Sequence, residues 1–332
     1  MTINDDFSFK GNRIICLNNE KLRIVIIPKL GGVITSLKYL PEDFEFLANL
    51  NSPKESYKYF SGRQVDNLLD LMFVGGYYEI IPNAGYISEY QGSKFGLHDE
   101  TPYLEWKYEY DEDRDPNSVL LIVSLQKFPF KLYKRLTLQD NSLIITEKLV
   151  NLSPTSQLPF SWLHHPTFGQ WVYTDDVSLD LPVETPIEVD SYLPQDNLCL
   201  EPGYKGEWPL ALNKEGDITN LYKFNLVSNK SCDDLVYVPK VLEGYFKIIN
   251  RKRNIILESK WDKDVFSSLW LWRAIGGGKS YPWFGRIKCA ALEISTSYPA
   301  TGLADQVKLN TAKWLAPLEE LKTTISYTVH PI

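Results

Sequence analysis

The alternation of apolar and polar residues along the chain is typical of short strands separated by turns. Residues 21–27 read K-L-R-I-V-I-I and end at P-K-L-G-G, before V-I-T-S-L begins a second apolar run. This pattern predicts a strand, a glycine-containing turn and another strand. Further strands are expected at residues 119–127, 130–138, 143–151, 235–238, 245–249, 254–259, 267–273 and 287–293.

The remaining segments are less regular. Apolar residues alternate with polar ones over 177–183, which predicts a strand with one solvent-facing side, and again over 324–330. Residues 41–70 are poorly patterned and are expected to form loops, and residues 185–222, rich in Pro, Asp, Asn and Gly, a long excursion. The best candidate for a helix is short and covers residues 304–315.

Many short strands with almost no sustained helical periodicity predict an antiparallel all-β architecture with few short helices. Sandwiches of this kind exceed about 200 residues as one domain. Because the sequence contains no Gly/Ser linker and no repeat, residues 1–332 are expected to form a single domain.

The net charge of the chain limits the classes of partner that it is expected to bind. A net charge of -7 argues against a nucleic-acid backbone or an anionic membrane as the main partner. No apolar run is long enough to span a bilayer, and the first residues, M-T-I-N-D-D-F, lack the features of a signal peptide. These observations predict a cytoplasmic protein. The four cysteines, Cys16, Cys199, Cys232 and Cys289, form no C-x-x-C, so reduced buried thiols are expected instead of disulfides or a thiolate metal site.

The clearest candidate for chemistry lies at residues 158–169, L-P-F-S-W-L-H-H-P-T-F-G. Imidazole titrates near neutral pH, which suits it to proton transfer. In an extended segment His164 and His165 point in opposite directions, and the proline favours His165 as the residue that faces a site. The alternative is a half-buried histidine pair at a strand end, with hydrogen bonds to the backbone.

Two more polar residues are candidates. Glu293 ends the segment I-K-C-A-A-L-E, where a small apolar face would desolvate the carboxylate and raise its pKa toward that of a general base. His98 lies in a glycine-preceded loop before two acidic residues. The alternatives are a strand-end glutamate bonded to the following S-T-S turn and an ordinary loop histidine.

Trp270 and Trp272 share one face of an expected strand. They are either a stacking platform for a sugar or part of the sandwich core. The sequence has no G-x-S-x-G, Walker loop, G-x-G-x-x-G after a strand, or H-E-x-x-H.

Together these segments resemble the aldose 1-epimerase (galactose mutarotase-like) family. H-P-T-F at 165–168 is similar to the family's H-x-Y-F, and A-L-E-I-S-T at 291–296 to its C-terminal L-E segment. G-L-H-D-E at 96–100 resembles the family's first histidine loop, and G-G-Y-Y-E-I-I-P-N-A-G at 75–85 the segment before it. The opening strands are also similar, so the resemblance runs from about residue 20 to 330 in the family's order.

The resemblance implies an antiparallel β-supersandwich with a sugar-binding cleft on one sheet, and a reaction that needs neither metal nor cofactor. It implies that Glu293 is the base on the anomeric hydroxyl, that His165 protonates the ring oxygen, and that His98 hydrogen-bonds near that oxygen. The expected sugar-binding residues are Asn83, His164, Phe168, Trp270 and Trp272.

The sequence departs from the family in its substrate-binding residues. Gly62 and Arg63 match the family's arginine motif only superficially, and Asp262 and Asp264 are only guesses for the aspartate that holds sugar hydroxyls. Two other functions therefore stay open. One is a carbohydrate-binding protein without turnover, and the other a metal-dependent sugar enzyme with His98, His165 and Glu293 as ligands. A glycosidase is disfavoured because only one carboxylate is available.

Overall fold

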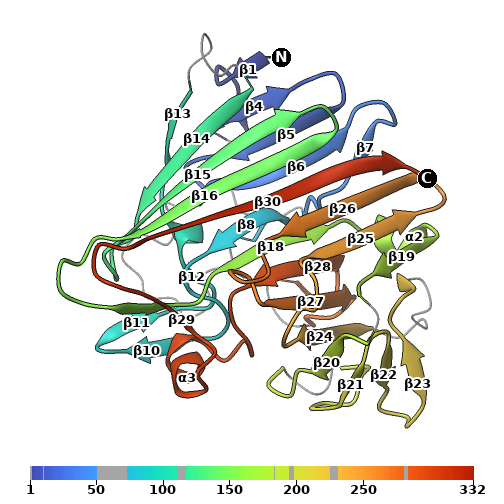
Figure 1. Cartoon of the computed structure of the whole chain (residues 1–332). Coiled ribbons are helices and arrows are strands. Elements are labelled where there is room, and N and C mark those ends of the chain that lie inside the picture. The colour runs from blue at the N-terminus through green and yellow to red at the C-terminus, as the bar shows by residue number, and fades with distance from the viewer. Residues whose placement is uncertain are drawn as a thin grey trace.

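Two large antiparallel sheets pack face to face, and their inward-pointing apolar side chains form one core (Figure 1). The computed structural model describes residues 2–9, 11–50, 73–110, 117–182, 184–193, 198–224, 231–279 and 283–332. Within these ranges the prediction of an antiparallel all-β chain with few short helices is confirmed.

The larger sheet has 12 strands in the described part of the chain. Its order is β1-β4-β5-β6-β8-β18-β28-β27-β24-β20-β21, with β7 paired to β6. The bounds are β1 (Thr2–Asn4), β4 (Ile15–Asn18), β5 (Leu22–Ile27), β6 (Val33–Tyr39), β7 (Phe44–Glu45), β8 (Gly76–Ile80), β18 (Leu163–Phe168), β20 (Pro186–Val189), β21 (Lys205–Glu207), β24 (Cys232–Val238), β27 (Ser268–Ile275) and β28 (Lys288–Ser295).

The smaller sheet has 8 strands, again counted over the described ranges, in the order β13-β14-β15-β16-β30-β26-β25-β19. Figure 1 shows the last strand of the chain, β30, running through its middle. The bounds are β13 (Lys107–Glu109), β14 (Ser118–Ser124), β15 (Phe130–Gln139), β16 (Ser142–Asn151), β19 (Val177–Asp180), β25 (Tyr245–Asn250), β26 (Ile255–Trp261) and β30 (Glu320–Pro331).

Short pairs of strands and a few helical turns join the two sheets. In Figure 1 the hairpins of residues 185–222 gather at one end of the molecule, which confirms the predicted excursion. The pairs are β2 (Ser8–Phe9) with β3 (Asn12–Arg13), β9 (Pro82–Asn83) with β12 (Asp99–Glu100), β10 (Ser88–Tyr90) with β11 (Ser93–Phe95), β17 (Leu158–Phe160) with β29 (Lys313–Leu315), and β22 (Leu210–Leu212) with β23 (Ile218–Asn220). The helices are η2 (Thr101–Tyr103), α2 (Trp171–Thr174) and α3 (Leu303–Lys308).

Two local predictions were partly wrong. The helix expected over 304–315 ends at Lys308, because Asn310 adopts a left-handed conformation (φ 56°) and β29 follows. The strand at 177–183 ends at Asp180 and lacks its expected solvent-facing side, since Ser178 is buried under a bridge to Lys223. Val183 and most of the loops expected at 41–70 lie outside the described residues.

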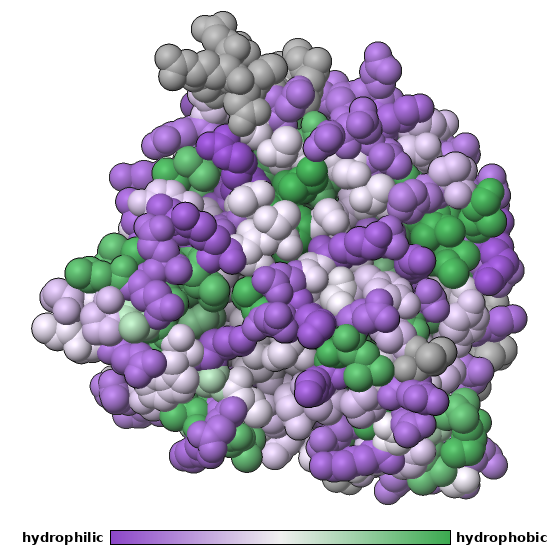
Figure 2. Space-filling view, in the orientation of Figure 1, coloured by the Kyte–Doolittle hydropathy of each residue, from purple (hydrophilic) through white to green (hydrophobic). Residues whose placement is uncertain are grey.

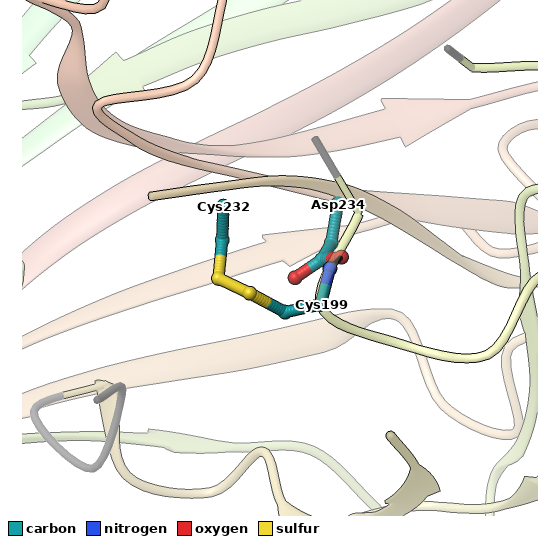
Figure 3. Close-up of side chains that lie close together, drawn as sticks. All are labelled: Cys199, Cys232 and Asp234. Carbon is teal, nitrogen blue, oxygen red and sulfur yellow. Dashed lines mark hydrogen bonds between the residues drawn. A yellow bond between two sulfur atoms is a disulfide. The ribbon is translucent and has the colours of Figure 1, made fainter. Parts of the chain in front are cut away.

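The prediction of four reduced cysteines was wrong for one pair. Cys199 and Cys232 form a disulfide with a Cα–Cα distance of 5.5 Å (Figure 3). The segment around Cys199 returns to the start of β24, where Asp234 Oδ1 accepts the backbone N–H groups of Cys199 (2.8 Å) and Leu200 (3.0 Å). The sequence shows no sign of this disulfide, because the two cysteines are 33 positions apart and form no recognisable motif. The other two cysteines are free thiols.

The surface contains both polar and apolar residues. Figure 2 shows polar residues over most of one face, with apolar residues in separate small groups. Across the ranges that the structure describes, none of the helices has the length and apolar character needed to cross a membrane.

Candidate active site

A row of side chains on the outer face of the larger sheet brings the predicted acid and base together. Consecutive residues of a strand point to opposite faces, so the odd-numbered residues of β18 face away from the sandwich core. His165 pairs with Tyr78 of β8 on one side. On the other side, the register of β18 with β28 places His165 opposite Glu293. The sheet therefore holds both residues on one face of adjacent strands.

The two side chains are in direct contact. His165 Nε2 lies 3.4 Å from Glu293 Oε1, and the side chains are 6% and 3% exposed. The other ring nitrogen of His165, Nδ1, lies 3.1 Å from Thr167 Oγ1, which fixes the orientation of the imidazole. The structure thus brings together a carboxyl group and an imidazole, two groups that commonly serve as general acids and bases.

Burial shifts both pKa values toward the neutral forms. Desolvation raises the pKa of Glu293 well above its ordinary value and lowers the pKa of His165 to about 4. Between about pH 4 and the raised pKa of Glu293, the pair therefore holds one proton, on the carboxyl group. The carboxylate–imidazolium form that an acid–base reaction requires holds the same single proton on the other partner. Moving that proton over the 3.4 Å between Oε1 and Nε2 interconverts the two forms.

His98 adds a hydrogen-bond donor to the same site. Its ring lies 5.7 Å from that of His165, between centroids. The backbone N–H of Gly85 donates to His98 Nδ1 at 3.1 Å, so in the neutral ring the proton is on Nε2. Burial, together with the neighbouring His165, lowers the pKa of His98 to about 3, which keeps the ring neutral. His98 therefore acts as a neutral N–H donor.

Aromatic rings enclose the other side of His165. We call Phe73, Tyr78, Trp272 and Trp283 the aromatic wall. The Phe73 ring lies 5.6 Å from His165 and the Trp272 ring 6.1 Å from it, between centroids. Phe73 also contacts Trp272 at 6.2 Å, Trp283 at 5.8 Å and Tyr78 at 5.7 Å. Of the two predicted tryptophans, Trp272 thus lies beside the acid–base pair.

The sequence did not point to Asp233. Its Oδ1 accepts the indole N–H of Trp272 at 2.7 Å, so this carboxylate lies next to the aromatic wall. Only the register of β24 with β27 places it there, and no local motif could have revealed it. The two aspartates that were guessed lie in the turn after β26, where the Asp264 side chain is 86% exposed and pairs with Lys263. Gly62 and Arg63 lie outside the described residues.

His164 turns the opposite way, into the space between the two sheets. It is fully buried, with Nε2 3.1 Å from Glu147 Oε2 and Nδ1 2.9 Å from the Tyr77 hydroxyl. Burial lowers the pKa of His164 to about 3. The structure therefore does not place His164 with the predicted sugar-binding residues, because its side chain is enclosed behind the sheet.

His164 belongs to a buried ionic cluster that also contains Glu79, Lys134 and Glu147. Lys134 Nζ lies 2.8 Å from Glu79 Oε2 and 3.9 Å from Glu147 Oε1. Desolvation raises the pKa of Glu79 to about 7 and also raises that of Glu147. One ammonium group thus faces two carboxyl groups, one of which is readily protonated. The cluster links β8 and β18 of the larger sheet to β15 and β16 of the smaller one.

The sequence contained a signal for this cluster. Lys134 and Glu147 occupy inward-facing positions of β15 and β16, where the neighbours of the same parity are apolar, and they are direct cross-strand partners. A lone charge at such a position in each of two adjacent strands predicts a buried pair.

Three other predicted sugar-binding residues have structural contacts instead. Asn83 is buried, with its amide nitrogen donating to the carbonyls of Tyr86 and Gly96. Phe168 points into the core between the sheets. Trp270 lies opposite Glu293 in the ladder, but its ring is buried and its N–H donates to the Ser297 carbonyl at 3.0 Å.

The alternative metal site is not assembled in the described part of the chain. Two groups there bring three potential ligand atoms within 4.8 Å of one another, and neither is the trio of His98, His165 and Glu293. One group includes the disulfide-bonded cysteines, and in the buried ionic cluster an ammonium group already neutralises the carboxylates. The trio of His98, His165 and Glu293 is therefore not among the described groups whose ligand atoms lie close enough together to hold one metal ion.

The fold is that of galactose mutarotase-like proteins. The Slr1438 protein from Synechocystis sp. PCC 6803 superimposes with a TM-score of 0.67 at 17% identity, over 98% of this chain and 99% of that chain. A candidate aldose 1-epimerase from Escherichia coli K12 gives 0.67 at 15% identity, over 97% and 100%. A galactose mutarotase-like protein from Lactobacillus casei gives 0.63 at 16% identity, over 96% and 100%. No family model and no curated protein matches the sequence. At these identities the likeness establishes the fold, which confirms the fold predicted from the sequence.

Proposed function

We propose that the protein is an aldose 1-epimerase-like enzyme that interconverts the α and β anomers of an aldose. The observation that supports this most directly is the contact between His165 Nε2 and Glu293 Oε1 at 3.4 Å on the outer face of the larger sheet. His98 and Trp272 lie next to the pair. A carboxylate and an imidazolium can then act on the two oxygens of one hemiacetal carbon.

The reaction begins with transfer of the anomeric hydroxyl proton to the Glu293 carboxylate. His165 gives its proton to the ring oxygen, the bond between that oxygen and the anomeric carbon breaks, and a free aldehyde forms. Rotation of the carbonyl exposes its other face. The ring closes again as His165 recovers its proton and Glu293 returns one to the new anomeric hydroxyl. No proton is gained or lost over the cycle.

The remaining residues can stabilise the charge that develops on the ring oxygen and hold the sugar in position. The neutral His98 is suited to donate a hydrogen bond to the ring oxygen as negative charge develops there. Trp272 offers an aromatic face to the C–H groups of a sugar, and Asp233 holds its indole N–H and lies within reach of hydroxyl groups beside it. These roles account for the polar and aromatic character of the site.

The decisive experiment is proton NMR exchange between the anomer signals of several aldoses, with catalytic amounts of protein. Faster exchange that is lost in Glu293→Gln supports the epimerase. Wild-type exchange rates in Glu293→Gln would contradict the assignment of the base. If no hexose, pentose or hexose phosphate exchanges faster, the proposal is wrong, and binding without turnover becomes the better description.

A further inference from the structure

We infer that the site prefers aldoses whose carbon 5 carries an apolar group, above all the methyl group of a 6-deoxyhexose. The inference rests on the proposed function, in which His165 protonates the ring oxygen. Carbon 5 is bonded to that oxygen. Its substituent therefore lies beside His165 whenever the sugar is placed to react.

The surroundings of His165 on this side are mainly carbon. The rings of Phe73 and Trp272 approach the imidazole to 5.6 Å and 6.1 Å. Trp283 backs Phe73 at 5.8 Å. The polar neighbours of His165 are Glu293 and Thr167, which lie at its two ring nitrogens, and His98, whose N–H is assigned to the ring oxygen of the sugar. A substituent on carbon 5 therefore meets the aromatic wall.

Two polar groups near this wall already have partners within the protein. The indole N–H of Trp272 donates to Asp233 at 2.7 Å. The Tyr103 hydroxyl donates to the Leu97 carbonyl at 2.6 Å. A carboxylate such as that of Asp233 can accept several hydrogen bonds, so a hydroxyl group on carbon 6 that faces the aromatic wall and not Asp233 would lose its own hydrogen bond to water.

The expected size of the preference for a methyl over a hydroxymethyl group follows from how strongly hydrophobic pockets in other enzymes discriminate against a hydroxyl group. A hydrophobic pocket rejects an added hydroxyl group by about 10²-fold at most. A methyl group gains the same carbon contacts without that loss. A phosphate on carbon 6 would place further negative charge near the Asp233 carboxylate and against the aromatic wall, so the phosphorylated sugar is expected to be the poorest substrate.

A series of four sugars tests the inference with one change at a time. L-arabinose, D-fucose, D-galactose and D-galactose 6-phosphate share their configuration at carbons 2 to 4 and carry hydrogen, methyl, hydroxymethyl and phosphorylated hydroxymethyl on carbon 5. D-xylose, D-quinovose, D-glucose and D-glucose 6-phosphate repeat the series in the gluco configuration. We expect kcat/KM for the methyl sugar to exceed that for the hydroxymethyl sugar by about 10- to 100-fold. Equal or faster turnover of the hydroxymethyl sugar in both series would overturn the inference.

Two consecutive aromatic residues provide matched variants. Trp283 belongs to the aromatic wall, whereas Phe284 is 56% exposed. In Trp283→Gln the methyl preference should fall toward one, because the amide offers a hydrogen bond to the hydroxyl group. In Phe284→Gln the preference should remain as in the wild type. An unchanged preference in Trp283→Gln would contradict the wall as its source.

Binding separates this inference from the proposed function. Quenching of tryptophan fluorescence by D-fucose and by D-galactose measures the preference without turnover. If no sugar is interconverted, the epimerase proposal fails, but tighter binding of D-fucose would still support the apolar subsite, and equal binding would contradict it. If both hexoses are interconverted at equal kcat/KM, only the inference about carbon 5 is wrong.

Discussion

His165 and Glu293 face each other at 3.4 Å in a nearly buried site, and His330 and Glu258 face each other at 3.3 Å on the outer face of the smaller sheet, where the His330 side chain is 42% exposed. The chain thus contains two histidine–glutamate pairs of similar spacing in opposite environments. Because the nitrogen–oxygen distances in the two pairs are similar, the exposed pair is a natural control for the buried one.

Removal of the buried pair should abolish turnover. Glu293→Gln and His165→Gln should each lower kcat/KM for anomer exchange by about 10²–10⁴-fold, the usual contribution of a general acid or base. NMR exchange measures this directly. Glu258→Gln and His330→Gln should retain wild-type rates. Equal losses in both pairs would mean that the variants act through stability instead of chemistry.

The pH dependence should follow the proton count of the pair. Below about pH 4 the pKa of His165 predicts that both partners are protonated, so no base remains. Above the raised pKa of Glu293 the pair loses its single proton, and no acid remains. After subtraction of the spontaneous reaction, kcat/KM should be flat between these limits. An acid limb at the ordinary pKa of histidine, about 6.5, would contradict this electrostatic picture.

Loss of the cation in the buried ionic cluster should destabilise the fold. Lys134→Met leaves Glu79 and Glu147 without their ammonium partner, which typically costs about 3–5 kcal/mol in the free energy of unfolding. The raised pKa of Glu79, about 7, gives the sign: both carboxyl groups become neutral as the pH falls, so the loss should shrink in acid. Urea denaturation at two pH values measures it.

Lys148 provides the control for this substitution. It lies on β16 and pairs with Glu320 at 3.1 Å, but both side chains are substantially exposed. Lys148→Met should cost less than about 1 kcal/mol, as is usual for a surface ion pair. A similar loss in both lysine variants would show that the cluster contributes no more than a surface contact.

The disulfide predicts how many cysteine thiols react before and after reduction. Denatured without reductant, the protein should show two reactive thiols, Cys16 and Cys289, and four after reduction. Cys199→Ser with Cys232→Ser should lower the free energy of unfolding by about 2–4 kcal/mol. Because Asp233 follows Cys232 directly, KM should rise more than kcat falls. Four thiols before reduction would rule the bond out.

Local patterns predicted the strands well because burial on one face leaves a period of two in the sequence. The same rule separated His164 from His165 by direction. The patterns could not give Asp233 or the disulfide, since both depend on which strands become neighbours. Nor could they give the surroundings of Phe73, because the sequence that precedes it has no regular pattern of apolar residues.

The contrast between the two tryptophans shows a further limit. Trp270 and Trp272 share a strand and a face, and the sequence treats them alike. Their difference arises from the segment around Ser297, which covers Trp270 and accepts its N–H. What lies over a sheet face is decided by loops, and loop placement leaves little trace in the pattern of apolar residues.

The two histidines of β18 each meet a glutamate, one on either side of the sheet. A slip of the strand by one residue would turn each histidine to the opposite face and could bring at most one of them to the other's glutamate, so the two pairs together favour the observed alignment. The neighbouring residues favour the same alignment, because a slip would turn Phe168 out of the core and Thr167 into it. The two histidine–glutamate contacts therefore also help to fix the register of β18, a structural role that is separate from the proton transfer proposed for His165.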